Sequence, residues 1–260
     1  MTRQKARATE QADLAGALQR LPAVESFVQR LLARFRPFMS LEPGDAVLDV
    51  GAAQGVTSAA FAMAGFRASG VEPWKPAIEI SRQFADRLGV QLDIRPGVGE
   101  HLPFEDESFQ LVHAYSVLEH VDDPLAVFRE AYRVLKPGGG FYFATTSAIC
   151  PVQVEIAGFP LFPWYPTAVQ RAIMSWAARD RPWLVGNTTR PAIHWFRHRR
   201  TRDQLAAIGY PRVADKWRLR AASGELHGLR QLAVQAADTI PPVRLAGNIV
   251  VGGVEYLAIK

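Results

Sequence analysis

The sequence contains a single cysteine, Cys150, among its 260 residues. One thiol forms neither an intrachain disulfide nor a cluster of thiolate metal ligands, so a disulfide-rich secreted fold and a cysteine-based zinc module are excluded. No apolar run is long enough to cross a bilayer, and the basic residues 3–7 are not followed by the uninterrupted apolar segment of a secretory signal. We therefore expect a soluble, cytoplasmic protein.

The chain has only a small excess of basic residues. It carries 30 Lys and Arg against 25 Asp and Glu, a net charge of +5, and part of the excess lies in residues 3–7 and 197–202. Such runs are usually solvated faces, and no RNA-binding module or zinc-ligand spacing accompanies them. We expect no nucleic-acid partner. The 48% of hydrophobic residues is enough for the core of one α/β domain with an appendage.

The most informative segment is a predicted strand at residues 47–50 that breaks into the small residues 51–55 and continues as a helical pattern. A strand, a tight turn and a helix N-terminus form a loop in which a ligand can approach the backbone. Glu72 follows the next predicted strand, residues 67–71. It lies about 20 residues past the loop, where a βαβ nucleotide site places a carboxylate on ribose hydroxyls. The pattern predicts an adenosine-containing ligand.

The glycine spacing argues against a dinucleotide. A G-x-G-x-x-G motif that begins at Gly51 requires glycine where Ala53 and Val56 stand, and those glycines admit the pyrophosphate. The motif Asp49-x-Gly51-x-x-x-Gly55 instead resembles the first motif of class I S-adenosylmethionine-dependent methyltransferases. The resemblance implies that Asp49 faces the ammonium group of the ligand and that the small residues of the loop surround its methionine part.

Further motifs follow in the same order as in that family. They are the segment 99–109, the strand 110–115, the Leu-x-His-Val sequence at 118–121, a helix that starts at Pro124, and the Leu-Lys-Pro-Gly-Gly sequence at 135–139. Over about residues 42–147 the chain resembles the ubiquinone- and menaquinone-biosynthesis-like methyltransferases. The resemblance implies S-adenosyl-L-methionine as cofactor and in-line methyl transfer to a small-molecule acceptor. A hydrophobic or lipid-linked acceptor and peripheral membrane contact stay open, as does a catalytically silent cofactor-binding regulator.

The resemblance also implies an α/β fold: a doubly wound, mostly parallel, seven-stranded Rossmann-like sheet with N-terminal helices. The last strand is antiparallel and forms a C-terminal hairpin. We divide the chain into an N-terminal helical extension, 1–40, and a methyltransferase domain, 41–260. The pattern predicts two helices in 10–39 separated at Pro22, helices at 167–178, 201–208 and 225–238, and strands at 213–219 and 249–259.

A Pro- and aromatic-rich insertion at about 148–200, after the fifth strand, is typical of a lid. Its aromatic residues, at 159–166 and at Trp176, Trp183 and Trp195, either cover an apolar substrate or pack the lid on itself.

The resemblance assigns most site residues to cofactor binding. Glu72 is the expected ribose ligand, and Trp74 can lie on the adenine face. Val98 stands where many relatives have an acidic residue for adenine, so the adenine contact passes to the Gly99 backbone or to Glu100. The full predicted cofactor set is Asp49, Gly51, Ala53, Gly55, Glu72, Trp74, Gly99, Glu100, Ala114, Tyr115 and Ser116.

Two histidines are candidates for a general base that deprotonates a hydroxyl acceptor: His120 after the fourth strand and His194 on the lid. Each also has a structural interpretation. Some ubiquinone-pathway relatives bind a metal through Glu-x-x-Glu-His, but Ser116 stands at the first position here and leaves only Glu119 and His120. We therefore expect no metal. Methyl transfer to base or amide nitrogens lacks its Asn/Asp-Pro-Pro-Tyr signature, since residues 114–117 differ from it. The sequence leaves the acceptor atom and the oligomeric state undecided.

Overall fold

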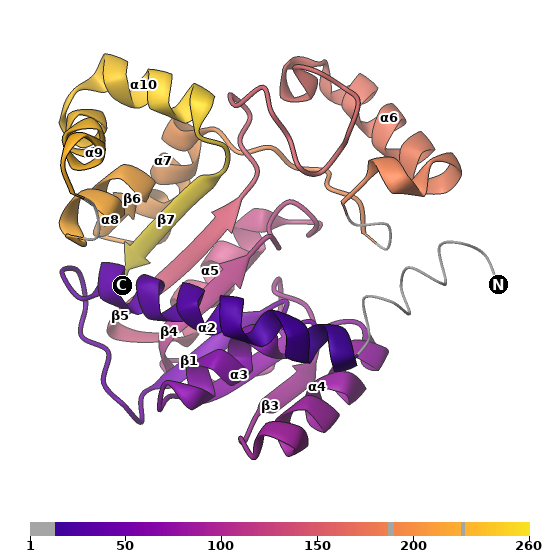
Figure 1. Ribbon diagram of the computed structural model, residues 1–260, viewed down its shortest axis with the longest axis vertical. Helices are drawn as coiled ribbons and strands as arrows, with labels where there is room; N and C mark the ends of the chain where they lie inside the picture. Colours follow the sequence, from indigo (N-terminus) through magenta and orange to yellow (C-terminus); the bar gives the residue numbers. More distant parts are fainter. Residues whose placement is uncertain (1–13, 187–189, 225–226) are drawn as a thin grey trace.

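The computed structural model describes residues 14–186, 190–224 and 227–260. Its centre is a seven-stranded sheet in the order β3-β2-β1-β4-β5-β7-β6 (Figure 1). β7 runs antiparallel to both of its neighbours, β5 and β6, and the other strand pairs of this sheet are parallel. The strands are β1 (Ala46–Val50), β2 (Arg67–Glu72), β3 (Asp93–Pro96), β4 (Phe109–Tyr115), β5 (Leu135–Thr145), β6 (Arg212–Asp215) and β7 (Val254–Ile259). The expected α/β fold with an antiparallel last strand is confirmed.

Helices cover both faces of the sheet because successive strand residues point to opposite sides. Leu48, Val112 and Phe141 pack under one group of helices, α5 (Pro124–Val134) and α7 (His198–Ile208). The neighbouring residues Val47 and Leu111 pack under the other group. That group contains α2 (Leu14–Phe35), α3 (Val56–Met63) and α8 (Lys216–Ala222), while α4 (Lys75–Leu88) packs beside α2 and α3.

The N-terminal segment differs from its prediction. Within the described residues one helix, α2, runs through Pro22 without a break. Pro22 is exposed, so water can reach the carbonyl that loses its helical hydrogen bond. The buried residues Ala17, Leu21 and Val28 pack on α3 and α4 on both sides of the proline, and this packing outweighs the local cost. The proposed boundary at residue 40 remains a prediction.

The predicted C-terminal hairpin is wrong. β6 and β7 do pair antiparallel, but α8, α9 (Leu229–Thr239) and α10 (Pro241–Val250) lie between them. The strand expected at 213–219 ends at Asp215, whose carboxylate accepts hydrogen bonds from the backbone of Trp217 and Arg218 and so starts α8. The last strand begins at Val254 because the apolar residues expected at its start belong to α10 and the following turn. Residues 225–226 of the predicted helix 225–238 lie outside the described residues.

The insertion after β5 folds as a separate element beyond the end of that strand, at the upper right of Figure 1. It contains η1 (Phe162–Trp164), α6 (Thr167–Asp180) and η2 (Pro182–Leu184). Phe162, Met174 and Ala177 are buried in a small hydrophobic core of the lid itself, with Trp195 packed against it. The helix predicted at 167–178 is confirmed by α6. No helix in the described part of the chain is both long and apolar enough to cross a membrane.

Candidate functional site

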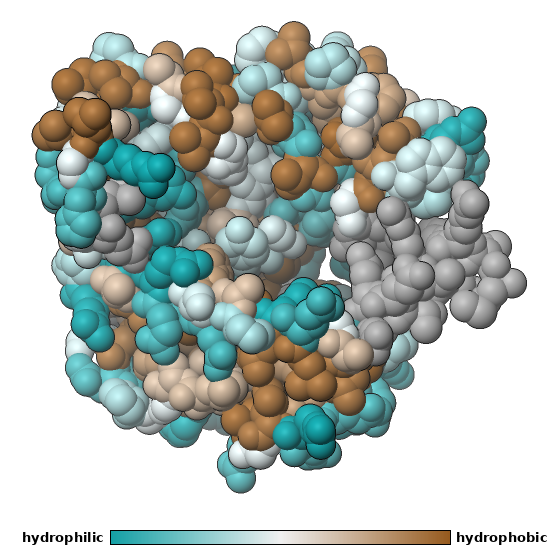
Figure 2. All heavy atoms as spheres, in the orientation of Figure 1, coloured by the Kyte–Doolittle hydropathy of each residue, from teal (hydrophilic) through white to brown (hydrophobic). Residues whose placement is uncertain are grey.

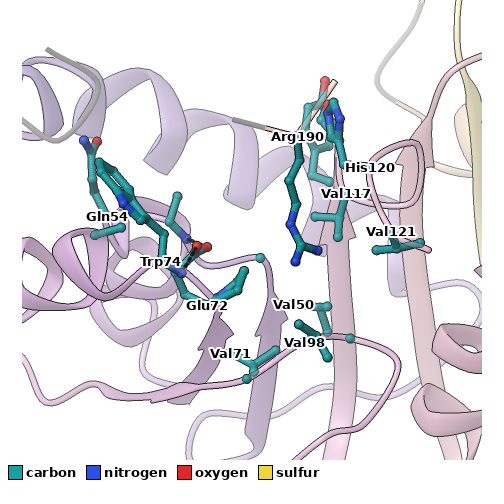
Figure 3. Close-up of a pocket in the computed structure, with 18 of the residues that line it drawn as sticks. Val50, Gln54, Val71, Glu72, Trp74, Val98, Val117, His120, Val121 and Arg190 are labelled. Atoms are coloured by element: carbon teal, nitrogen blue, oxygen red, sulfur yellow. Dashed lines mark hydrogen bonds between the residues drawn. The ribbon is translucent and has the colours of Figure 1, made fainter. Parts of the chain in front are cut away.

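A cavity of about 590 Å³ opens at the carboxyl ends of β1, β2 and β4 (Figure 3). This volume lies within the range of about 300–1,000 Å³ typical of small-molecule sites. The place is the one expected for a ligand in a doubly wound sheet. The cavity is lined by Arg20, Val50, Gly51, Ala53, Gln54, Val71, Glu72, Pro73, Trp74, Ala77, Gly97, Val98, Gly99, Glu100, Tyr115, Ser116, Val117, His120, Val121 and Arg190.

The loop after β1 needs its glycines for different reasons. Gly51 has φ +72°, and a Cβ atom there would lie 2.6 Å from Cγ2 of Val117. Any side chain at this position would therefore strain the backbone and push Val117 aside. Gly55, with φ +75°, is the N-cap of α3 and does not line the cavity. Gly51 and Ala53 form the wall, and Gly55 sets the start of the helix.

Glu72 joins the two loops that border the cavity. Its Oε2 accepts a hydrogen bond from the Ala53 backbone N–H and its Oε1 accepts one from the Trp74 N–H, both at 2.9 Å. Burial raises the pKa of the Glu72 carboxyl, while the two backbone hydrogen bonds act in the opposite direction. The carboxylate is thus fixed at the wall, where it can meet a pair of ligand hydroxyls.

The loop 97–100 closes the other end of the cavity. Oε1 of Glu100 accepts a hydrogen bond from the Asp122 N–H at 2.8 Å. The other oxygen, Oε2, is buried and has no hydrogen-bond partner among the described residues. A buried acceptor without a donor is costly, so this atom suits an exocyclic amino group of a ligand. Val98 and Val50 lie close together and supply apolar surface to the cavity wall (Figure 3).

The structure does not bring Asp49 or Ala114 to the cavity lining. Asp49 is 4% exposed, accepts a hydrogen bond from Ser58 Oγ and pairs with Nδ1 of His113, both at 2.9 Å. Its side chain lies on the α2–α3 face of the sheet, because strand residues alternate and the next residue, Val50, takes the cavity side. Ala114 is fully buried in the core under α5.

Three polar lining residues were not predicted from the sequence. Arg20 extends from α2 and donates a hydrogen bond to Oε1 of Gln54, while Nε2 of Gln54 is buried without a partner in the described structure. Arg190 enters the cavity from the lid, between His120 and Glu72 (Figure 3). Arg20 and Arg190 belong to no recognisable motif, and Gln54 stands at a variable position of the motif 49–55. Only the position of Gln54 inside the loop 51–55 gave a signal.

His120 is the histidine that lines the cavity. Its Nδ1 is buried and has no hydrogen-bond partner among the described residues, and its Nε2 lies 3.8 Å from Oε2 of the lid residue Glu155. Burial lowers the pKa of His120 to about 4, so the ring is neutral at pH 7. Burial likewise raises the pKa of Glu155. Desolvation is the largest cause of both shifts, so burial disfavours charge on both groups.

Glu119 precedes His120 in the chain, and its side chain is buried, with 1% exposed. Its Oε2 accepts a hydrogen bond from Thr145 Oγ1 at 2.6 Å, and burial raises its pKa to about 7. One ligand atom from each of Glu119, His120 and Glu155 lies within 4.8 Å of the others. Two carboxylates and an imidazole form a donor set that can hold a divalent cation. We expected no metal on the basis of Glu119 and His120 alone, because Glu155 is distant from them in the sequence.

His194 lies outside the cavity lining. Its Nε2 is 2.9 Å from the Val121 carbonyl oxygen, and the Ile193 and His194 backbone N–H groups donate to the Glu119 carbonyl at 2.8 and 3.3 Å. These contacts tie the lid to the loop after β4, which is the structural role weighed for this histidine. Among the described lid residues only Arg190 lines the cavity. The lid aromatics expected to cover a substrate are therefore not part of the wall.

Residues 48–143 match the family described as methyltransferase domain. The chain is 37% identical over 103 residues to a ubiquinone biosynthesis O-methyltransferase of Pseudomonas putida, a match that covers 39% of this chain and 44% of that relative. The chain therefore spans less than half the length of that relative.

Two solved structures share the fold of this chain over most of its length, although their sequence identity to it is low. The YcgJ protein from Bacillus subtilis has a TM-score of 0.57 at 19% identity, with 89% of this chain and 98% of that chain covered. A geranyl diphosphate methyltransferase in complex with GPP and sinefungin has a TM-score of 0.56 at 20% identity, with 92% and 77% covered. At this level of identity the likeness shows the fold alone.

Proposed function

We propose that this chain is a class I S-adenosylmethionine-dependent methyltransferase, which transfers a methyl group from S-adenosyl-L-methionine to a small-molecule acceptor. The observation that carries the proposal is Glu72, a carboxylate fixed by the Ala53 and Trp74 backbone at the cavity wall. Such a carboxylate binds the two ribose hydroxyls of an adenosine ligand.

The other lining residues fit the remaining parts of the cofactor. Trp74 and Val98 offer surfaces for the adenine ring, and the unpartnered Oε2 of Glu100 can accept its amino group. Arg20 is placed to pair with the methionine carboxylate. Tyr115 and Ser116 lie at the end of β4, where the methionine side chain passes. S-adenosylmethionine, when bound, supplies a methyl group already activated by its sulfonium. The protein then needs mainly to align the acceptor and exclude water.

We propose a hydroxyl as the acceptor and His120 as its base. His120 lines the cavity, and its neutral ring has a buried Nδ1 with no partner in the described structure. A rotation of the ring toward the acceptor would let this atom take the hydroxyl proton during attack. The relative from Pseudomonas putida is named an O-methyltransferase, which supports oxygen as the methylated atom. His194 stays a second candidate that requires a movement of the lid. The sequence predictions of a hydrophobic or lipid-linked acceptor and a cytoplasmic location belong to the same proposal.

The test uses purified full-length protein with methyl-labelled S-adenosylmethionine and, separately, the aqueous and lipid fractions of a bacterial extract. We expect a labelled product, identified by mass, whose yield falls roughly 10- to 150-fold in the Glu72→Ala variant at cofactor concentrations below Kd. A Glu79→Ala variant, altered at an exposed position of α4, is the matched control. Tight cofactor binding without a labelled product in either fraction would contradict the proposal and favour the catalytically silent binding protein.

A further inference from the structure

Helix α10 turns its polar residues inward and its apolar residues outward. Leu245, Ile249 and Val250 are 56%, 37% and 79% exposed. The only charged residue of the helix, Arg244, pairs with Asp215 and Asp238 at 3.3 and 3.0 Å. Asn248 is buried and accepts a hydrogen bond from Trp217 Nε1.. Figure 2 shows the resulting hydrophobic residues at the upper left, over α9 and α10. An uncovered apolar surface of this kind marks an interaction site.

A groove of about 570 Å³ runs between α10 and the start of α7. Arg197, Arg199 and Arg200 line it at the first turn of α7, which contains no acidic residue. Arg197 and Arg200 are exposed and have no ion pair with any described residue, and Arg199 reaches Asp203 only at 3.9 Å. The N-terminal end of a helix disfavours cations and attracts anions. The helix N-terminus and the three arginine side chains therefore both favour an anionic ligand at this end of the groove.

An exposed tryptophan of the lid contacts one of the residues that line the groove. Trp164, from the lid, is 55% exposed, and its Nε1 donates to the carbonyl oxygen of Ile149 at 3.3 Å. Ile149 and Leu245 both line the groove, so the surface continues from the lid to α10. Figure 1 shows the lid and α10 at the same end of the molecule. Tryptophan is favoured at the boundary between lipid and water, where its ring has both apolar and polar contacts.

We propose that this surface, made of α10, the three groove arginines and Trp164, docks on an anionic phospholipid membrane. The apolar side of α10 enters the headgroup region, and Arg197, Arg199 and Arg200 contact lipid phosphates. This combination of an outward apolar face with adjacent cations is typical of helices that lie in a membrane interface. A second copy of the chain fits less well, because a two-fold contact repeats the same surface and brings the arginines of both copies together. The inference does not depend on the proposed methyl transfer.

The test is flotation of the full-length protein with phosphatidylcholine vesicles and with vesicles that also contain phosphatidylglycerol. We expect binding only to the anionic vesicles, and less of it at high salt. The Arg197→Gln/Arg200→Gln variant should bind roughly 10- to 30-fold more weakly, from the usual effect of a basic residue near an anionic surface. The Leu245→Asp/Ile249→Asp variant should lose binding. Both pairs of positions are exposed, so thermal unfolding should stay near that of the wild type.

Arg82→Gln/Arg87→Gln is the charge-matched control. Both residues are exposed on α4, which lies at the β3 edge of the sheet away from α10 (Figure 1), and this variant should bind vesicles like the wild type. The proposal is overturned if the wild type ignores anionic vesicles, or if all three variants bind them equally. It is also overturned if Leu245→Asp/Ile249→Asp dissociates a dimer in light scattering while vesicle binding is absent, since the surface would then be a contact between copies.

Discussion

Replacing Glu72 with alanine should weaken the binding of S-adenosylhomocysteine by about 1.5–3 kcal/mol, or roughly 10- to 150-fold in Kd. The estimate corresponds to the loss of charge-assisted hydrogen bonds from one carboxylate to two ribose hydroxyls. Part of it is indirect, because the same oxygens hold the Ala53 and Trp74 N–H groups at 2.9 Å. These donors border an open cavity in which water can replace the carboxylate. The accompanying loss of folding stability should therefore be only about 1–2 kcal/mol.

The pH dependence supplies a second check on Glu72. Burial raises the pKa of its carboxyl, so the native state holds a proton more readily than the unfolded chain does. Its contribution to stability is present below the ordinary carboxyl pKa and is lost as the pH rises through the raised value. Cofactor binding has the opposite sign, because the hydroxyls need the ionised carboxylate. Affinity should therefore fall as the pH is lowered through the raised pKa in the wild type, and not in Glu72→Gln.

Titration calorimetry of wild type, Glu72→Ala and Glu72→Gln with S-adenosylhomocysteine measures these effects without turnover. Thermal unfolding of the same samples reports the stability term separately. We expect Glu72→Gln to lie between the other two, since an amide keeps one acceptor oxygen. The assignment of Glu72 to the ribose is refuted if the folded Glu72→Ala protein binds within two-fold of the wild type.

Four further outcomes are expected. Glu119→Gln should be more stable than wild type by about 3 kcal/mol at pH 8 and equal to it near pH 4. The reason is that a carboxyl with a pKa of about 7 loses its stabilising contribution as the pH rises through that value. Denaturant titrations from pH 4 to pH 8 measure this difference in the free energy of unfolding. Arg20→Gln should weaken S-adenosylhomocysteine binding by about 1–3 kcal/mol but leave methylthioadenosine, which lacks the carboxylate, unaffected; equal losses for both ligands would remove Arg20 from that role. His120→Ala should lower kcat by roughly 10²–10⁴ with cofactor affinity preserved, while His194→Ala should mainly lower the melting temperature; full activity in both would exclude a histidine base. Deleting residues 158–190 should abolish turnover and leave cofactor affinity mostly intact, whereas loss of both would make the lid part of the core.

The sequence predicted best where one local pattern determines both structure and position. The strand, turn and helix at 47–63 place Gly51 at the cavity wall, and the distance along the chain to Glu72 gave its location at the end of the adjacent strand. Asp49 shows the limit of such motifs. Its place next to Val50 at the strand end did not reveal that its side chain points to the opposite face and binds Ser58 and His113.

The residues that the sequence did not predict are those whose position depends on tertiary packing. Arg20 reaches the cavity because α2 packs on α3, and Glu155 reaches His120 because the lid folds back over the loop after β4. The sequence did not predict helix α10 for another reason. Its inverted distribution, with Leu245 outside and Asn248 inside, does not follow the rule that apolar residues mark the buried face.

The two ends of the lid insertion meet beside β5. Phe196 N–H donates to the Thr146 carbonyl at 3.3 Å, and Ala148 N–H donates to the Phe196 carbonyl at 2.8 Å. The insertion also has its own buried residues, Phe162 and Met174 among them. A segment that leaves and returns at one point, and that is packed internally, can be exchanged during evolution without altering the strands beneath it. For the proposed methyltransferase, the choice of acceptor can therefore diverge by replacement of this module while the loops that line the cavity are inherited unchanged.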